Sequence, residues 1–581
     1  MKYEHWQIPA APEDAIKTLM DAGYPYLVSS VLAARGVTTS EQAAEALERE
    51  KTLAYSPFLM KDMDKAVARI SKALENGEKL AVFGDYDVDG ITSTCLLTDY
   101  LRSRGADVTM HIPRRIEEGY GLGCDAIRAL SESGVTLIVT VDCGITGVDE
   151  TAYAATLGVD LVITDHHECH DELPEAEAVI DCKQAGDTYP FDSLAGVGVA
   201  FKLICALDGD TDAMLDRYAD LVALGTVADV MPIVGENRIL VAEGLQRMER
   251  TRNIGLQRLL AEAGMAERHL TASTISFVLA PRINAAGRMR MDENDENASP
   301  SGGHAAVELL IEGNESIAAE FGNVIDAYNQ DRKSIDRSVT QEAHDFIERN
   351  PAMKELKSTV IYNPKWMKGI VGIVASRLIE TYYRPTVVLT MSNGFVTGSA
   401  RSVPGFDLYQ AVESCSDLLE NFGGHMYAAG LTMRPENVEE FTRRFNAYVE
   451  ENIDPQMLMP QVDIDSELLF SDITPAFRKD LNRFQPFGPG NTAPVFATYG
   501  VSNHGDAKLV GMECEHLRMD LIQRQKPNTK IQSIAFQQPT HYEWVRSGRP
   551  IDVCYQIVEN HYRGTVTTQL RIKDIKPVMN R

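Results

Sequence analysis

Aspartate side chains follow three separate apolar segments of this chain, and their placement is the first sign of chemistry. Asp142 and Asp165 stand directly after a run of mainly aliphatic and β-branched residues, and Asp85 follows such a run after Gly84. In a parallel α/β sheet, ligands bind at the carboxyl ends of the strands, so these carboxylates are expected to meet at one edge. Packed together, they would repel one another by several kcal/mol unless cations neutralised them. The sequence therefore predicts a cation site.

Further candidate ligands lie near these aspartates. Asp85 opens the sequence DYDVDG at residues 85–90, Asp165 is followed by two histidines, and a helix-like run leads to Asp229. Carboxylate oxygens with one or two imidazoles suit Mn²⁺ or Mg²⁺ better than a structural zinc, which prefers cysteine and histidine. The expected cation is therefore manganese or magnesium.

Simpler interpretations explain only parts of this pattern. A single aspartate after a strand is usually a turn or helix-cap residue. DYDVDG also resembles the start of a calcium loop, but Leu96 occupies the twelfth position, where such a loop has glutamate. The sequence HHECH at residues 166–170 could bind zinc. Three strand-end acids together with a histidine pair favour the manganese or magnesium site.

The segments that must position these side chains follow the pattern of an α/β fold. Short apolar runs alternate with helical patterns from residue 79 onward, which is typical of βαβ units around a parallel sheet. Other elements are expected at 12–76 (short helices), 214–350 (mostly helical, with one long connecting helix at 315–349), 359–362 and 386–389 (strands), 370–382 and 408–420 (helices), 423–425 (a glycine-rich turn), and 533–536, 553–558 and 565–572 (strands of a small barrel).

Composition restricts the class of protein. The 581 residues are 44% hydrophobic and 24% charged, which is typical of globular domains. This length predicts about three to four domains. No apolar run is long enough to span a membrane, and the first residues do not resemble a signal peptide. Nine scattered cysteines without a CxxC pair favour reduced thiols and a cytoplasmic location.

The charge of the chain is unevenly distributed. A net charge of −28 argues against a polyanionic partner when the chain is taken as a whole. Residues 501–581, however, contain five Lys and seven Arg against eight Asp and Glu, whereas residues 291–320 contain eight Asp and Glu and no Lys or Arg. We therefore expect weak binding to duplex nucleic acid and a narrow basic channel for one strand.

Four motifs carry a family resemblance. DYDVDG at 85–90, VDCGI at 141–145, DHH at 165–167 and GTVAD at 225–229 resemble the ordered motifs of the DHH phosphoesterase superfamily. The sequence from Gly423 to Gly430 resembles the hallmark of its DHHA1 substrate domain. Within the superfamily the chain is most similar to the RecJ family of single-stranded-DNA-specific 5′→3′ exonucleases. Further stretches similar to that family lie at 118–122, 194–201, 281–288 and 487–491.

This resemblance covers nearly the whole chain and implies a multidomain α/β architecture. The implied parts are an N-terminal helical segment (1–50), a DHH catalytic domain with a parallel sheet (51–235), a helical region with the long connecting helix (236–350), a smaller DHHA1 α/β domain (351–455) and a C-terminal OB-fold β-barrel (456–581). The implied activity is hydrolysis of single-stranded DNA from its 5′ end, releasing 5′-mononucleotides, in DNA repair and recombination.

The resemblance also assigns metal ligands. It implies two Mn²⁺ or Mg²⁺ ions, with Asp142 bridging them. The other implied ligands are Asp85, Asp87, Asp89, His166 and Asp229, Asp89 being a further acid of the first motif whose role is less defined. His167 is expected to face the scissile phosphate, and Asp165 to orient the histidines. Such a pair of ions would activate water for in-line attack, so that no covalent nucleophile is needed.

Substrate contacts follow from the same resemblance. Ser399 and Arg401 match a Ser-x-Arg element that contacts phosphate at the 5′ end, and Arg115 matches a basic residue of similar role. Arg282 and Asn284 match a stretch near the catalytic centre. The other implied contacts are Gly424 and His425, on a turn whose backbone N–H groups can hold phosphate oxygens.

Some positions depart from the family pattern. Cys143 stands where asparagine is usual, Met367 replaces histidine after Trp366, and Asp181-Cys182 replaces Asn-Pro. Acidic sequence at 291–303 looks inserted. None of these changes affects an expected metal ligand, but Met367 removes a polar contact on the substrate side.

The sequence leaves two alternative functions open. One is another DHH activity, such as pyrophosphatase, cyclic dinucleotide phosphodiesterase or short-oligonucleotide hydrolase, which the length and the terminal barrel disfavour. The second is a DNA-binding scaffold with a decayed site, which the intact motif acids disfavour. Family precedent implies cooperation with single-strand-binding protein and a RecQ-type helicase. A monomer with no membrane partner is expected.

Overall fold

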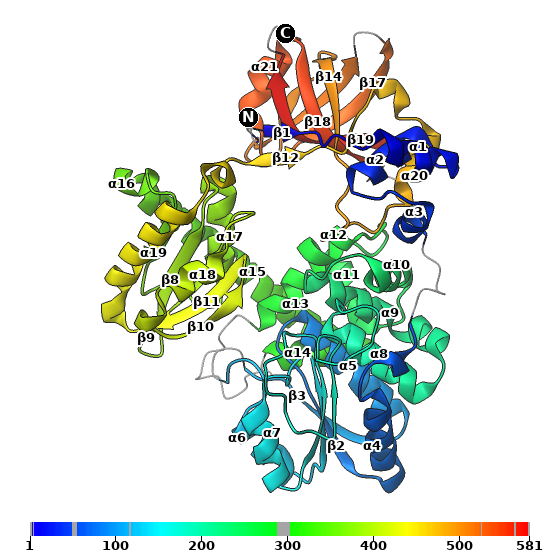
Figure 1. Cartoon of the computed structure of the whole chain (residues 1–581), viewed down its shortest axis with the longest axis vertical. Coiled ribbons are helices and arrows are strands. Elements are labelled where there is room, and N and C mark those ends of the chain that lie inside the picture. The colour runs from blue at the N-terminus through cyan, green and yellow to red at the C-terminus, as the bar shows by residue number, and fades with distance from the viewer. Residues whose placement is uncertain are drawn as a thin grey trace.

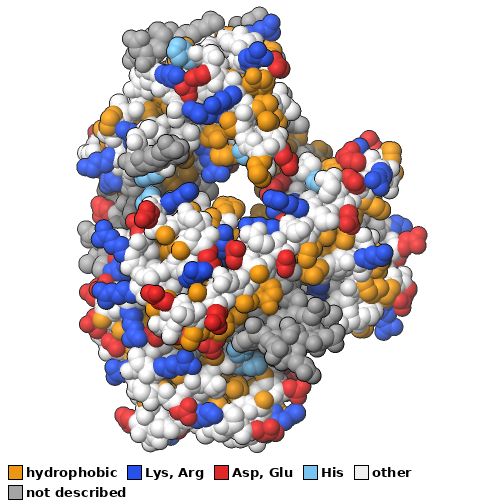
Figure 2. Space-filling view, turned by 180° about the vertical axis from the view of Figure 1, so that it is seen from behind, with side chains coloured by type: hydrophobic (Ala, Val, Ile, Leu, Met, Phe, Trp, Pro, Cys, Tyr) orange, Lys and Arg blue, Asp and Glu red, His pale blue; other side chains and the backbone are white. Residues whose placement is uncertain are grey.

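The computed structural model describes residues 3, 5–48, 55–114, 118–287, 302–523, 526–562 and 565–578. Figure 1 shows three β-containing parts arranged around an open centre, with a long helix between the first two. The space-filling view from behind shows the same opening between the parts, with both basic and acidic side chains near its rim (Figure 2). No helix among the described residues is long and apolar enough to cross a membrane.

The first part is built on a five-stranded parallel sheet with the order β3-β2-β4-β5-β6. Leu80 and Val82 face a core shared with α4, α5 and α8, whereas Ala81 and Phe83 face a second core shared with α6 and α7. Burial of both faces explains the uninterrupted apolar runs of the sequence. The elements are α4 (Met63–Asn76), β2 (Lys79–Phe83), α5 (Val88–Ser103), β3 (Asp107–His111), α6 (Cys124–Glu132), β4 (Leu137–Val141), α7 (Val148–Thr156), β5 (Asp160–Thr164), β6 (Ala178–Ile180) and α8 (Gly196–Asp208).

Helices follow this sheet, as the sequence predicted for residues 214–350. They are α9 (Thr211–Ala228), α10 (Gly235–Met248), α11 (Ile254–Glu262), α12 (Ala272–Thr274), the π-helical turn η3 (Ile275–Leu279), α13 (Ala280–Ala286), α14 (Gly302–Ile311) and α15 (Glu315–Glu348). The 34 residues of α15 span roughly 50 Å at 1.5 Å per residue. Helix α15 packs on α11, α13 and α14 and then on α17 (Val371–Tyr382) of the next part, so it is the predicted connecting helix.

The second part is a smaller α/β unit with the strand order β10-β11-β9-β8-β7. Its elements are α16 (Pro351–Lys354), β7 (Thr359–Tyr362), α17 (Val371–Tyr382), β8 (Thr386–Ser392), β9 (Phe395–Arg401), α18 (Leu408–Glu413), β10 (Leu419–His425), β11 (Ala428–Met433) and α19 (Val438–Asn452). Two expectations were wrong here. The helix predicted to reach residue 420 ends at Glu413, and the predicted glycine-rich turn is the end of strand β10, because residues 423–425 pair with β11.

The third part is a seven-stranded sheet that closes on itself. The strand order is β13-β14-β18-β19-β17-β16-β15, and β14 also pairs with β16, which closes the strands from β14 to β16 into a ring with β13 and β15 attached to it. Closure leaves fewer unpaired strand edges exposed. The elements are β12 (Gln461–Asp463), β13 (Ser466–Glu467), α20 (Pro475–Asn482), β14 (Phe496–Asn503), β15 (Lys508–Val510), β16 (His516–Gln523), β17 (Lys526–Ala535), α21 (Tyr542–Arg546), β18 (Ile551–Tyr562) and β19 (Thr565–Pro577).

The N-terminal elements pack on this third part. They are β1 (His5–Gln7), α1 (Glu13–Asp21), α2 (Tyr26–Ala34) and α3 (Ser40–Leu47). Leu19 and Val28 share one hydrophobic core with Phe484 and Phe496, and β1 pairs in parallel with β12. The two ends of the chain are therefore joined in one packed unit.

Candidate active site

The three strand-end aspartates lie at one edge of the first sheet. Asp85, Asp142 and Asp165 follow β2, β4 and β5, which are neighbours in the strand order. Parallel strands bring their carboxyl ends together, so the predicted convergence is observed. Asp229 arrives from a different element, as the C-cap of α9.

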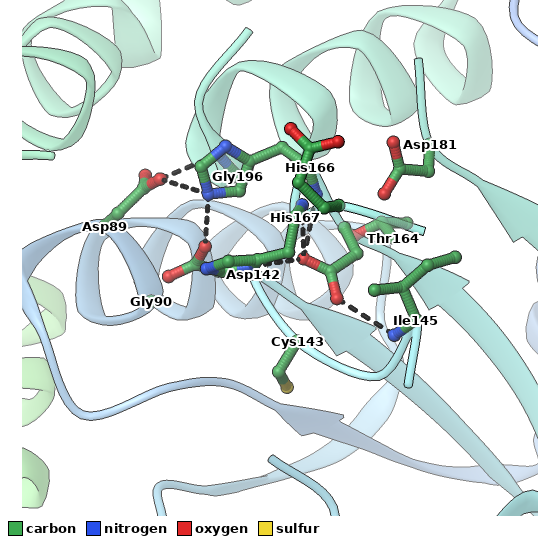
Figure 3. A network of polar contacts seen from close by, with 12 residues as sticks. Asp89, Gly90, Asp142, Cys143, Ile145, Thr164, His166, His167, Asp181 and Gly196 are labelled. Atoms are coloured by element: carbon green, nitrogen blue, oxygen red, sulfur yellow. Dashed lines mark hydrogen bonds and ion pairs between the residues drawn. The ribbon is translucent and has the colours of Figure 1, made fainter. Parts of the chain in front are cut away.

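The candidate ligand atoms form a continuous series. Three groups have ligand atoms within 4.8 Å of one another and could each hold a metal ion: Asp85, Asp87 and Asp142; Asp142, His166 and His167; and Asp89, His166 and Asp229. His166 Nε2 lies 3.0 Å from Asp142 Oδ1 and 3.6 Å from Asp229 Oδ2. Figure 3 shows the His166 ring between Asp89 and Asp142. Because Asp142 and His166 each belong to two groups, the series is suited to adjacent ions.

The electrostatics of this cluster favour the binding of cations. Burial, followed by repulsion from Asp89, Asp87, Asp85 and Asp229, raises the pKa of Asp142 well above its usual range. Burial and the same kind of repulsion raise the pKa of Asp229 to about 8. Burial also lowers the pKa of His166 to about 3, which keeps the imidazole neutral and able to bind a metal.

Buried atoms without hydrogen bonds support the same conclusion. Asp142 Oδ1 and both ring nitrogens of His166 are buried and have no partner of hydrogen-bond geometry among the described residues, although Asp142 Oδ1 and His166 Nε2 approach each other to 3.0 Å. Buried polar atoms in folded proteins normally have a hydrogen-bond partner, and a bound ion is one explanation for buried atoms that lack one. The oxygen and imidazole donors fit Mn²⁺ or Mg²⁺.

Backbone geometry around Asp142 is unusual. Its φ of 60° lies in the left-handed region, which is uncommon for residues other than glycine and is often found at active sites. The first residue of α8 packs directly against it: a Cβ on Gly196 would lie 2.6 Å from Asp142 Oδ1. Only glycine fits this approach, which explains the glycine in the stretch LAGVG at 194–198.

Asp89 holds a helix end as well as facing the cluster. Its two carboxylate oxygens accept hydrogen bonds from the backbone N–H groups of Gly196 (2.7 Å) and Val197 (2.9 Å) at the start of α8. Asp89 Oδ2 also lies 3.8 Å from His166 Nε2. Burial and the charge of Asp87 raise the pKa of Asp89 to about 7. The side chain therefore contributes to the local fold in addition to any ligand role.

His167 is held by Asp165. Its Nδ1 lies 2.7 Å from Asp165 Oδ1, while Asp165 Oδ2 accepts the backbone N–H of Ile145 at 2.9 Å. Burial disfavours the charged imidazole, but the hydrogen bond and charge of Asp165 outweigh it and raise the pKa of His167 to about 9. Burial likewise raises the pKa of Asp165, yet the hydrogen bond from His167 leaves it lowered overall. The pair thus carries a proton on the imidazole at neutral pH.

Tyr120 is a neighbour of His167 for which the sequence suggested no role. Its hydroxyl lies 3.0 Å from His167 Nδ1, and its ring packs edge-on against the imidazole. Gly119 and Gly121 on either side have φ values of 90° and 85°, which residues with a Cβ rarely adopt. The sequence EGYGL carried this signal, but the contact joins segments 47 residues apart and could not be read from it.

A cavity of about 810 Å³ lies between the first sheet and the second α/β unit. Tyr86 and Tyr120 line it from the first part, and Ser399 and Arg401 line it from β9. Arg401 Nη1 donates hydrogen bonds to Ser399 Oγ (2.9 Å) and to the carbonyl oxygen of Ala400 (2.8 Å). Two of the predicted substrate residues therefore border one cavity that reaches the first motif.

The other predicted substrate residues lie elsewhere or outside the described residues. Arg115 lies outside the described residues. Arg282 and Asn284 lie on α13, and Arg282 Nη1 donates to the carbonyl oxygen of Val278 at 2.6 Å. The C-terminal end of α13 approaches the first motif, since a Cβ on Gly287 would lie 3.1 Å from the carbonyl oxygen of Tyr86.

Gly424 and His425 are exposed residues of β10 and are not among the residues that line the cavity, although the adjacent Gly423 is. The backbone N–H groups predicted to form an anion-binding turn belong instead to a strand paired with β11.

Family models match each part of the chain. The DHH family, N-terminal domain, matches residues 79–226, the DHHA1 domain matches residues 355–451, and the RecJ OB domain matches residues 464–574. The first match contains the strand-end aspartates, and the second contains Ser399 and Arg401.

Curated relatives and solved structures resemble the whole chain. The single-stranded-DNA-specific exonuclease RecJ of Bacillus subtilis is 36% identical over 573 residues, covering 98% of this chain and 70% of the relative. The protein of the same name from Escherichia coli is 33% identical, covering 96% and 97%. The crystal structure of RecJ in complex with Mn²⁺ from Thermus thermophilus has a TM-score of 0.79 at 26% identity, covering 99% and 80%. The chain therefore belongs to the RecJ family of single-stranded-DNA-specific exonucleases.

Proposed function

We propose that this protein is a metal-dependent 5′→3′ exonuclease that hydrolyses single-stranded DNA to 5′-mononucleotides in DNA repair and recombination. The observation that carries the proposal is the series of carboxylates and imidazoles from Asp85 to Asp229, placed at one edge of a parallel sheet beside a cavity that contains Arg401. Family membership supports the class of reaction, because its relatives are named as exonucleases specific for single-stranded DNA.

The ligand series would hold two ions of Mn²⁺ or Mg²⁺. Asp85, Asp87 and Asp142 would hold one, and Asp142, His166, Asp229 and Asp89 would surround the other. When bound, such ions neutralise phosphate charge and lower the pKa of water. The neighbours in complex with Mn²⁺ and with Mg²⁺ from Thermus thermophilus support the choice of ions.

The protein's own side chains would orient the phosphate. Asp165 fixes the His167 ring and keeps a proton on it, so the imidazolium can donate a hydrogen bond to a phosphate oxygen. Arg401 and Ser399 line the cavity and would bind the 5′ end there, as their resemblance to a Ser-x-Arg element suggests. Further contacts proposed from the same resemblance, outside that lining, are Arg115, Arg282, Asn284, Gly424 and His425. An anchored 5′ end gives the polarity of degradation.

The cellular setting is also a proposal. All nine cysteines are free thiols, which supports a reducing, cytoplasmic location. We propose a monomer that acts after a RecQ-type helicase, which would supply single strands with 5′ ends, and beside single-strand-binding protein, which would keep those strands unpaired. The domain boundaries at 50, 235, 350 and 455 are proposed as well.

A comparison of substrates tests the function. The protein would be incubated with Mn²⁺ and four oligonucleotides of several tens of nucleotides: a single strand with a free 5′ end, one with a blocked 5′ end, a blunt duplex and an RNA strand. Release of mononucleotides from the free 5′ end only supports the proposal. Equal cleavage of the 5′-blocked strand from its 3′ end would refute the polarity, and cleavage of the duplex at the same rate would refute the strand specificity.

A further inference from the structure

The chain directly after Asp229 has an unusual conformation. Val230 has a φ of 62°, in the left-handed region, which is an outlier for a β-branched residue, and it is 68% exposed. Its N–H bonds to the carbonyl oxygen of Val227, and the N–H of Met231 bonds to that of Thr226, both at 3.3 Å. These bonds form a Schellman motif, which usually has glycine at the left-handed position. Because the exposed Val230 side chain buries little apolar surface, the strained turn must be held by its surroundings.

The third part contacts this segment through the loop FGPGN at 487–491. The N–H of Ile233 donates to the carbonyl oxygen of Pro489 at 2.7 Å. Ile233 is itself fully buried, in the hydrophobic core that the first sheet shares with α8 and α9. A Cβ on Gly488 would lie 2.4 Å from Ile233 Cγ1. The loop is therefore packed so closely on Ile233 that a side chain at Gly488 would displace it.

The loop is braced from within the third part. Asn491 Nδ2 donates to the carbonyl oxygens of Phe484 (2.7 Å) and Pro486 (2.9 Å). The N–H groups of Gly488 and Asn491 each bond to the carbonyl oxygen of the other, at 3.0 and 3.1 Å. Phe484 is buried in the core of the third part. The loop is thus anchored to that core at one end and to Ile233 at the other.

Helix α10 holds the same segment from another side. Asn237 is fully buried, and its Nδ2 donates to the carbonyl oxygens of Pro232 (3.1 Å) and Ser193 (2.5 Å). Three residues separate Asp229 from Ile233. The first two are fixed by the Schellman motif, and the ring of Pro232 restricts its own φ. A displacement of Ile233 is therefore passed on to Asp229.

We propose that the loop at 487–491 is a positioning element for Asp229, which is one of the proposed metal ligands. By fixing Ile233, the loop holds the strained turn at Val230 and with it the Asp229 carboxylate, which lies 3.6 Å from His166 Nε2. The catalytic sheet would thus reach its full metal affinity only with the third part docked on it. This inference deepens the proposed function and rests on its assignment of Asp229 as a ligand.

The positioning role predicts an effect on one ion and not on the other. Asp229 belongs to the ligand group with Asp89 and His166. Asp85 and Asp87 belong to the other group and lie between β2 and α5, away from the segment that the loop contacts. Displacement of the loop should therefore weaken the ion beside Asp229 alone. A general loss of stability would not distinguish between the two ions.

Binding of Mn²⁺ to the full-length protein without DNA tests this role. The free ion is measured by electron paramagnetic resonance during a titration, and the wild type is expected to bind two ions. Gly488→Ala should weaken one of them about 10-fold, as is typical when the support of a metal ligand is lost, and leave the other unchanged. Gly490→Ala should weaken the same ion by a smaller factor, because its Cβ would lie 3.1 Å from Val234 Cγ1.

Gly500→Ala is the matched control. Gly490 and Gly500 both belong to the third part and have φ values of 70° and 65°, so alanine is strained alike at both positions. A Cβ on Gly500, however, would meet no atom within 4 Å. The control should bind both ions as the wild type does. Urea unfolding in EDTA shows whether each variant is folded, and if Gly488→Ala is not, Gly490→Ala and Gly500→Ala decide the question.

Three results would overturn the positioning role. The first is wild-type affinity for both ions in the folded variants of the loop, and the second is equal weakening of both ions. The third is a loss of affinity in Gly500→Ala as large as that in Gly490→Ala. Fewer than two bound ions in the wild type would instead refute the proposed two-ion site, and the positioning role with it.

Discussion

Asp142 lies where the two halves of the ligand series meet. Its carboxylate is buried, faces His166 at 3.0 Å, and belongs to the group with Asp85 and Asp87 as well as the group with both histidines. The φ of 60° and the close approach of Gly196 fix it in that position. No other residue of the series combines these properties, so its replacement should disturb both proposed ions.

His167 and Asp165 give a prediction at the residue scale that depends on pH. Asp165 raises the pKa of His167 to about 9, so wild-type activity that needs the imidazolium should be retained below that pH and fall as the pH rises through it. In Asp165→Asn the charge is lost and the pKa of His167 decreases. Its activity should therefore fall at lower pH, and at pH 8 the variant should be about 100-fold slower. A pH–rate profile measures this.

Asp181→Asn is the control for that profile. Asp181 lies at the end of the neighbouring strand β6, and burial raises its pKa to about 7. Its Oδ1 accepts the N–H of Lys183 at 2.8 Å, whereas the carboxylate that bonds to His167 is that of Asp165. Asp181→Asn should shift the pH–rate profile less than Asp165→Asn does. Identical profiles for wild type and Asp165→Asn would refute the role given to Asp165.

At the scale of elements, the site depends on strand ends and helix starts that touch. The carboxyl ends of β2, β4 and β5 supply the acids, and the first turn of α8 closes over them through its bonds to Asp89. Gly196 is the point of contact. The fit of α8 against β4 is therefore a condition for the ligand geometry as well as for the core.

Gly196→Ala tests this contact. A Cβ would lie 2.6 Å from Asp142 Oδ1, so α8 or Asp142 must move. We expect a loss of about 1–3 kcal/mol in the free energy of unfolding and at least a tenfold loss of Mn²⁺-dependent activity. Urea unfolding and a nuclease assay measure the two effects. Gly313→Ala, where a Cβ would meet open space, is the control, and equal behaviour of both variants would contradict the proposed packing constraint.

At the scale of the whole molecule, one arginine links distant parts. Arg238 of α10 is buried and donates to the carbonyl oxygens of Glu48 (2.9 Å), Arg483 (2.6 Å) and Gln485 (3.3 Å). The N–H of Ile233 also bonds to the carbonyl oxygen of Pro489 at 2.7 Å. The third part is thereby fixed to the helices that follow the catalytic sheet, on one side of the open centre (Figure 1).

Arg238→Met should uncouple these parts. The buried carbonyl oxygens would lose their donor, at about 1–3 kcal/mol for each unsatisfied group. We expect a single thermal transition in the wild type and separate or earlier melting of the third part in the variant, measured by calorimetry. Arg247→Met is the control, because Arg247 lies on the same helix but pairs with Asp216 and Glu243. A single, unshifted transition in Arg238→Met would contradict this role.

Features of the fold that depend on local hydrophobic pattern could be predicted from the sequence. The strand-end acids, the long helix α15 and the β-rich C-terminal part were predicted because buried strands and helices have distinct hydrophobic periods. The pairing of β1 with β12 and the packing of α1–α3 on the third part join distant segments and leave no periodic signal. The strand at 423–425 was missed because its glycines are typical of turns, whereas pairing with β11 decides their conformation.

The measurement that bears on the whole proposal is Asp142→Asn, assayed for stability and cleavage with and without Mn²⁺. Asparagine keeps the shape and tolerates a φ of 60°, but removes a carboxylate whose pKa is raised by burial and by neighbouring acids. Without metal, the variant should be more stable than the wild type at pH 8, since a raised carboxyl pKa destabilises the fold at high pH. With Mn²⁺, it should gain little stability and release no mononucleotides from a 5′-ended single strand. Near-normal cleavage by this variant would contradict the two-ion site.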